Sequence, residues 1–374
     1  MAAGATYGYL LVWVVVVANL MACLVQFLSA KLGVVTGQSL PEALRDRMPR
    51  WGRLAYWGQA ELVAMATDLA EVLGGAIALN ILFDLPLLLG GVITGLVSTG
   101  LLAVQSRRGQ QPFERAITGL LAVIAIGFFA GLFVSPPSLS ETLGGLRPAF
   151  DGADSVLLAA GMLGATVMPH AVYLHSALAR DRHGRPDGAQ QKRLLTASKY
   201  DVGSAMLLAG AVNLAMLLLA ATALQGQDTG GSLQGAHQAV SDTLGSTVAL
   251  LFALALLASG LASTSVGCYA GAVVMEGLLR RRIPLLMRRT ITLIPALVVL
   301  AAGVDPTQAL VISQVVLSFG IPFALIPLLR LTSQRAVMGD VANHKVTIAV
   351  ACVVVTAVVT LNLVLLYLTV DSFR

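Results

Sequence analysis

A short stretch in the middle of the chain, GATVMPHAVYLH at 164–175, combines a proline, a methionine and two histidines inside an otherwise apolar segment. Proline lacks a backbone N–H and crowds the preceding turn, so a helix must kink or unwind between Thr166 and Met168. In a membrane, unwound backbone is tolerated only where it is buried in protein or lines a watery cavity. The pattern therefore leaves the carbonyl of Ala165 free to bind a cation, although an ordinary proline kink would produce the same residues.

Met168 places a thioether directly beside this predicted break. A thioether is a soft ligand that favours transition metals over Ca²⁺ or Mg²⁺, while most of the chain's eleven methionines are expected to fill space. His170 and His175 are five residues apart and project in different directions on a helix, so they cannot form the i, i+4 pair of a zinc protease. Each histidine fits either a titratable group on an ion path or a hydrogen-bonded core side chain.

Two carboxylates, Asp68 and Glu71, stand three residues apart in the segment MATDLAEVLGGAIALNILF and share one face of a helix. Carboxylates inside an apolar span are costly and mark ion paths or proton relays. Two acids this close repel each other when both are ionised, which favours keeping one proton on the pair and suits proton coupling. The alternative is a structural pair held by an arginine from a neighbouring helix.

The composition identifies the environment in which these residues lie. The chain is 57% hydrophobic and 11% charged, against roughly 25% charged residues in a soluble domain, so we predict an all-α polytopic membrane protein in contact with the lipid bilayer. The net charge of +5 comes from short basic clusters without interleaved aromatics, which argues against a nucleic-acid partner. The three cysteines lie in apolar runs without CxxC spacing, and we assign them no role.

A membrane-spanning helix needs about 20 apolar residues, and this rule predicts about ten transmembrane helices in one domain covering residues 1–374. The predicted spans are 9–30, 55–83, 86–105, 115–135, 153–181, 202–224, 245–277, 288–302, 307–330 and 346–369.

The basic residues divide unevenly between the loops that join these spans. Of the 24 lysines and arginines, 22 lie in five alternate loops, 31–53, 105–115, 180–199, 280–289 and 330–345. Lys and Arg mark cytoplasmic loops, so these five are predicted to face the cytoplasm and the protein to lie in the cytoplasmic (inner) membrane. The loop 225–245 has neither residue, as expected for an outer loop.

This topology puts Met1 on the outer face. The opening MAAGATYGYL has no basic n-region and no room for a signal peptide. One further helix upstream would return the N-terminus to the cytoplasm, and we expect such a helix to be missing from the chain. A natural outer N-terminus of nine residues is the alternative.

Three segments resemble the third, sixth and tenth helices of the Nramp family of proton-coupled divalent metal transporters, in particular its bacterial MntH type. They are TDLAEVLGGAIALNILF, GATVMPHAVYLHSAL and DPTQALVISQVVLSFGIPFALIPLL. The similarity extends over essentially the whole chain from GATYGYLLVWVVVVANLMACLVQFLSAKLGVVTG onward. It implies a LeuT-like fold with two inverted five-helix repeats, and Mn²⁺ or Fe²⁺ as the cargo, driven by protons, with no resident cofactor.

The resemblance also implies roles for single residues. The Ala165 carbonyl and the Met168 sulfur would be metal ligands, and Gln314 in SQVVLSFG would lie near the metal. The acids Asp68 and Glu71 and the histidines His170 and His175 would belong to the proton route and the gates.

The chain departs from the family at its beginning. The first Nramp helix carries an Asp-Pro-Gly-Asn break whose Asp and Asn complete the metal site, and this tetrapeptide is absent here. The predicted spans would then be family helices two to eleven. The chain as it stands is expected not to transport metal and to bind it far more weakly than a form with the first helix.

Three other interpretations were weighed. Another LeuT-fold symporter, for an amino acid or an inorganic ion, would explain the broken helix but not a thioether at the break. A non-transporting fragment would fold without activity. An intramembrane enzyme would need a nucleophile with a base or an HExxH motif, and neither is found, so we expect no enzyme.

Overall fold

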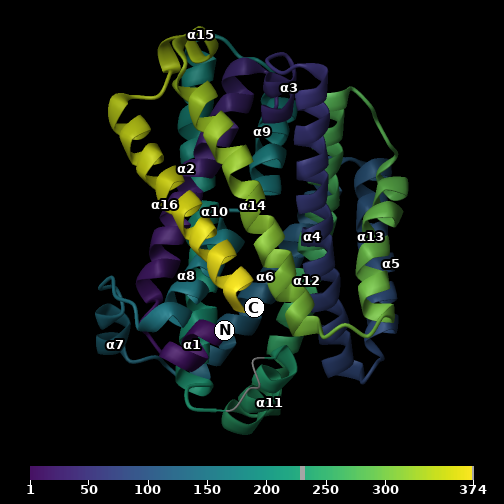
Figure 1. Ribbon diagram of the computed structural model, residues 1–374, viewed down its shortest axis with the longest axis vertical. Helices are drawn as coiled ribbons and strands as arrows, with labels where there is room; N and C mark the ends of the chain where they lie inside the picture. Colours follow the sequence, from purple (N-terminus) through teal and green to yellow (C-terminus); the bar gives the residue numbers. More distant parts are fainter. Residues whose placement is uncertain (228–231, 373–374) are drawn as a thin grey trace.

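The computed structural model describes residues 1–227 and 232–372, and every regular element within them is helical. Figure 1 shows these helices standing roughly side by side as one bundle. Their bounds are α1 Ala2–Tyr7, α2 Val12–Thr36, α3 Leu40–Arg45, α4 Arg50–Phe83, α5 Leu87–Arg108, α6 Gln110–Val134, α7 Leu139–Gly144, α8 Gly152–Thr166, α9 Pro169–His183, α10 Gly188–Ala223, α11 Leu233–Leu244, α12 Ser246–Leu279, α13 Leu285–Ala301, α14 Pro306–Ser333, α15 Arg335–Met338, a 3₁₀ turn Gly339–Val341, and α16 Lys345–Ser372.

Nine helical segments among the described residues are long and apolar enough to cross a membrane, where the sequence predicted about ten. The predicted span 288–302 corresponds to α13, which has only 17 residues and packs against α5 and α4. At 1.5 Å per residue this helix is shorter than a bilayer core is thick. The all-helical membrane fold is confirmed, and α13 is the one predicted span that falls short in length.

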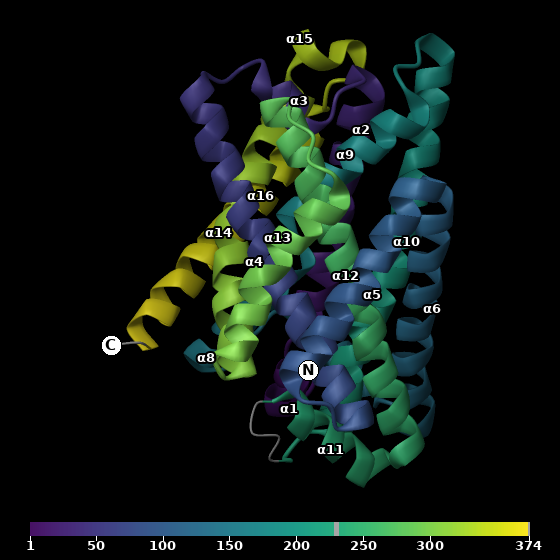
Figure 2. The same ribbon diagram turned by 90° about the vertical axis from the view of Figure 1, so that its right-hand side faces the viewer.

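The loops with and without basic residues lie at opposite ends of the bundle. In Figures 1 and 2, α3 and α15 lie at the top, while α1 and α11 lie at the bottom. The loops 31–53 and 330–345, which contain α3 and α15, therefore share one end of the molecule. The described part of loop 225–245, which contains α11, lies at the other end.

The predicted loop 280–289 extends too far along the chain. The sequence placed Arg288 and Arg289 in the loop 280–289, but α13 begins at Leu285 and both arginines lie within it. Their exposed fractions are 2% and 1%. These two charges are thus not loop charges, because each has an acidic partner inside the bundle that makes burial tolerable.

The helix α4 is the central element of the site. It packs along α12, α14, α5 and α13. The two helices α4 and α12 approach closely at Gly260, where an added Cβ would lie 2.8 Å from the Glu71 carbonyl oxygen. Because glycine has no side chain, the two backbones can touch at this point. This contact sets the position along the helix axes at which α12 faces the acids of α4.

Candidate ion-translocation site

The predicted helix break is present. Helix α8 ends at Thr166, Val167 and Met168 lie outside any helix, with extended backbone at Met168, and α9 begins at Pro169. The residue four positions after Ala165 is Pro169, which has no N–H, so the Ala165 carbonyl lacks the donor that a continuous helix would give it. Ala165 is exposed and Met168 is partly exposed. The break therefore presents one free carbonyl and one thioether close together in the chain.

The helix α14 lies against this break. An added Cβ on Gly164 would lie 2.8 Å from the Ser318 hydroxyl, and one on Gly320 would lie 3.3 Å from the Pro169 ring. Gln314 precedes Ser318 by four residues, so the two side chains share one face of α14. Gln314 is partly buried on the α14 face that passes α8. The three sequence-predicted metal ligands thus come from elements that are in contact.

Asp68 is an almost fully buried carboxylate paired with an arginine. Its Oδ1 lies 2.8 Å from Arg289 Nη1 and accepts a hydrogen bond of 2.6 Å from the Thr264 hydroxyl. Arg289 also donates from Nε to the Ser98 hydroxyl at 3.0 Å, while its Nη2 has no hydrogen-bond partner in the described part of the chain. The structure therefore gives Asp68 the arginine partner that the sequence offered as the alternative to a proton relay.

Glu71 differs from Asp68 although it is one turn away on the same helix. No ion pair of Glu71 occurs among the described residues, and the Ser263 side chain of α12 is its hydrogen-bonding neighbour. The two predicted acids are close to each other, as expected, but only one of them is neutralised by a basic side chain.

A third acid on α4 extends this network and was not identified from the sequence. Glu61 binds Arg288 through both carboxylate oxygens, at 2.6 and 2.7 Å from Nη2. Glu61 precedes Asp68 by seven residues, which places both on one face of α4. The seven-residue spacing could have indicated from the sequence that Glu61 belongs with Asp68. Their partners Arg288 and Arg289 could not be recognised, because both arginines were assigned to a loop.

The two histidines face different helices, as their spacing predicted. His170 Nδ1 lies 3.4 Å from the Thr67 hydroxyl of α4, beside Asp68. His175 Nδ1 lies 2.7 Å from Gln26 Oε1 of α2. His170 is thus adjacent to the acidic network, whereas His175 is removed from it. Among the described residues no three His, Cys, Asp or Glu side chains converge into a metal site.

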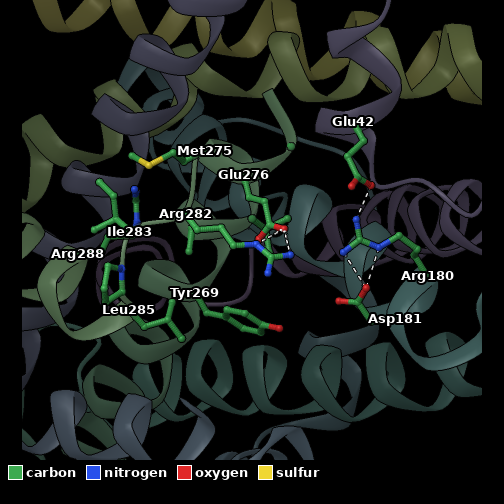
Figure 3. Close-up of a pocket in the computed structure, with 14 residues that line it drawn as sticks. Glu42, Arg180, Asp181, Tyr269, Met275, Glu276, Arg282, Ile283, Leu285 and Arg288 are labelled. Carbon is green, nitrogen blue, oxygen red and sulfur yellow. Dashed lines mark hydrogen bonds and ion pairs between the residues drawn. The ribbon is translucent and has the colours of Figure 1, made fainter. Parts of the chain in front are cut away.

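A cavity of about 510 Å³, whose lining includes six charged side chains, opens beside Arg288 at the end of the bundle that carries α3. In Figure 3, Arg180 lies between Glu42 and Asp181, and Glu276 is paired with Arg282. Partial burial would raise the pKa of Glu42, but hydrogen bonds from the Ser39 backbone N–H and from Arg180 outweigh it and lower that pKa. The cavity gives Arg288, and through it Glu61, access to the charged surface of the protein.

Comparisons with known proteins agree with this geometry. The Nramp family model, described as natural resistance-associated macrophage protein-like, matches residues 1–368. The divalent metal cation transporter MntH of Mycobacterium tuberculosis is 63% identical over 370 residues, which cover 99% of this chain and 86% of that protein.

Solved structures are similar as well. The manganese transporter of Eremococcus coleocola, at 33% identity, matches with a TM-score of 0.88 over 97% of this chain and 81% of that one. Mhp1, a nucleobase-cation-symport-1 family transporter, is 16% identical and matches with a TM-score of 0.64 over 98% of this chain and 84% of that one. The expected LeuT-like fold is confirmed by these likenesses.

Proposed function

The chain belongs to the Nramp family, and from this premise we propose that it moves divalent transition-metal cations, Mn²⁺ or Fe²⁺, across the cytoplasmic membrane together with protons. The metal is cargo and not a resident cofactor. The observation that carries the proposal is the break between α8 and α9, which exposes a free carbonyl and a thioether at the middle of a membrane span. In transporters with discontinuous helices, such a break forms the substrate site.

The ligand chemistry supports a transition metal. The Ala165 carbonyl is a hard oxygen ligand, the Met168 sulfur is a soft one, and Gln314 adds an amide oxygen on the facing helix. Soft sulfur adds nothing to the binding of Ca²⁺ or Mg²⁺, which prefer oxygen alone. A mixed set of this kind therefore discriminates against the two most abundant divalent cations.

The buried charges of α4 and α13 support a proton route. Among the described residues Glu71 has no counterion, Asp68 and Glu61 are each paired with an arginine, and Arg288 borders the cavity of Figure 3. His170 lies at the start of this row and within reach of Thr67. Titratable groups at membrane depth are retained where ions or protons pass. The series of groups from His170 through the α4 acids to Arg288 leads away from the metal ligands.

The orientation follows from the loops. Basic loops remain in the cytoplasm, so the end of the bundle with α3 and α15 faces inward, and the protein lies in the cytoplasmic membrane. The cavity beside Arg288 then opens to the cytoplasm, which is where protons that accompany imported metal would be released.

Metal competition in proteoliposomes tests the ligand assignment. We expect Met168→Ala to raise the ratio of Ca²⁺ to Mn²⁺ uptake by about tenfold, since the lost sulfur contact contributed only to transition-metal binding. Met162→Ala, on α8 and away from the break, is the matched control and should leave the ratio unchanged. An unchanged ratio in Met168→Ala would remove the thioether from the site.

A further inference from the structure

A second cavity, of about 480 Å³, lies between the first two turns of α4 and the end of α12. It lies apart from the metal ligands and adjoins the cavity in Figure 3, with which it shares Met275 and Ile283. The early turns of α4 stand at the upper left edge of the bundle in Figure 2. Its lining consists of Arg50, Arg53, Leu54, Trp57, Met275, Leu278, Leu279, Arg281 and Ile283.

The charge of this lining is of one sign. It contains three arginines and no acidic residue. None of the three forms an ion pair within the described part of the chain, whereas Arg180, Arg282 and Arg288 nearby each have a carboxylate partner. Arg280 ends α12 in the left-handed conformation, with φ of 54°, and this turn brings Arg281 back beside α4. The fold thus brings three arginines together in this cavity and provides no carboxylate among the described residues to neutralise them.

Two hydrogen-bond donors in the same cavity also lack acceptors. The Nε of Arg53 and the Nε1 of Trp57 are shielded from solvent and have no hydrogen-bond partner among the described residues. A buried donor without an acceptor is costly, and native proteins rarely retain one unless a water or a ligand completes it. The two donors are four residues apart on α4, so they point to the same side of the helix.

The chemistry that satisfies these groups is that of a phosphate ester. It carries negative charge, offers several acceptor oxygens to the planar guanidinium groups, and can accept from an indole N–H at the same time. A cation is repelled by three unpaired arginines. A site for the transported metal is therefore excluded here on charge.

The surroundings indicate the source of the phosphate. Trp51, on the turn that begins α4, is 80% exposed, and Leu62 farther along the same helix is 54% exposed. An exposed tryptophan beside basic residues marks the membrane interface, and the apolar surface below it suits acyl chains. Basic pockets between helices on the cytoplasmic side bind anionic lipid headgroups. We propose that this pocket binds the phosphate of an anionic phospholipid from the cytoplasmic leaflet.

Binding can be measured without transport, on the purified protein in neutral detergent. Dioctanoyl phosphatidylglycerol is titrated while the thermal midpoint is followed, and dioctanoyl phosphatidylcholine and inorganic phosphate are titrated in parallel. We expect phosphatidylglycerol to raise the midpoint in a saturable way and phosphatidylcholine to raise it far less. Arg53→Gln should weaken the apparent affinity for phosphatidylglycerol about tenfold, as for the loss of one charge-assisted contact.

The matched control is Arg107→Gln, which removes an exposed arginine from the same end of the bundle, outside the pocket. It should retain the affinity of the wild type. Arg281→Gln, on the connection after α12, provides a second pocket variant should Arg53→Gln fail to fold. Saturable binding of inorganic phosphate with equal affinity supports the phosphate chemistry and assigns a soluble source. Equal responses to both lipids, or pocket variants that match Arg107→Gln, would overturn the proposal.

Discussion

Asp68 and Glu71 stand one turn apart on α4 but have different partners, and substitutions at the two positions should differ accordingly. Asp68→Asn leaves the buried Arg289 uncompensated and is expected to cost about 3–5 kcal/mol of stability. Glu71→Gln breaks no ion pair and should cost less than about 1 kcal/mol, because an amide keeps the shape and the hydrogen bonds of a protonated acid. Thermal unfolding in detergent measures both.

Proton and metal fluxes, recorded separately in liposomes, decide what the two acids do beyond stability. We expect Glu71→Gln to reduce proton flux or change its pH dependence more than it changes Mn²⁺ binding, since Glu71 lies outside the helix break. Asp68→Asn should disturb proton flux in the same sense. If both fluxes fall only in proportion to the amount of folded protein, the acids are structural.

At the scale of elements, the close contact between α4 and α12 depends on a single glycine, Gly260. Gly260→Ala would place a Cβ 2.8 Å from the Glu71 carbonyl oxygen and 3.0 Å from the Gly75 nitrogen, and backbone atoms cannot move aside. We expect a loss of about 1–3 kcal/mol, as in other overpacked cores. Gly267→Ala, on the same helix pair, meets only the Thr67 methyl at 3.5 Å and should be neutral or slightly stabilising. Equal thermal midpoints for the two variants would contradict this account.

The short helix α3 is connected to α9 by a hydrogen bond from the Leu40 N–H to the Ser176 hydroxyl and by the carboxylate of Glu42. Glu42 closes a capping box with Ser39 and forms an ion pair with Arg180, and its pKa is lowered below the usual value of about 4.5. A lowered pKa stabilises the fold above the usual value, and this stabilisation is lost as the pH falls through the lowered pKa. Glu42→Gln should therefore cost about 1 kcal/mol at neutral pH, and the difference from wild type should disappear in strong acid. Glu114→Gln, in the exposed pair with Arg182, is a control expected to cost less.

At the scale of the whole molecule, the charges of the loops predict which end faces the cytoplasm. In a background with Cys23, Cys268 and Cys352 replaced by serine, a membrane-impermeant maleimide should label Gln238→Cys on α11 in intact cells. Ala189→Cys, at the start of α10 in a basic loop, should react only after the membrane is opened. Both positions are exposed, so accessibility is decided by the membrane alone. The opposite labelling pattern would invert the proposed topology.

Several properties of this protein follow from the sequence alone because they depend on local chemistry. A proline without an N–H ends a helix wherever it occurs, so the break at 167–168 and the free Ala165 carbonyl were predictable from Pro169. Long apolar runs predict membrane helices because burial of apolar side chains in lipid is likewise a local property of the run. The spacing of five positions between His170 and His175 directs the two side chains toward different neighbouring helices. The resemblance of three helical segments to the Nramp family was likewise evident from the amino-acid sequence.

The partners of the buried charges were decided only by the tertiary structure. Arg288 and Arg289 look like loop charges next to Arg280–Arg282, and nothing in their neighbours along the chain distinguishes them. Only the packing of α13 against α4 and α5 brings them to Glu61 and Asp68. The same holds for Glu71. It has no counterion among the described residues because the helices packed around it place no basic side chain within contact. An ion pair between residues more than 200 positions apart depends on the fold, because no local pattern encodes which of several distant charges the packing will bring within contact.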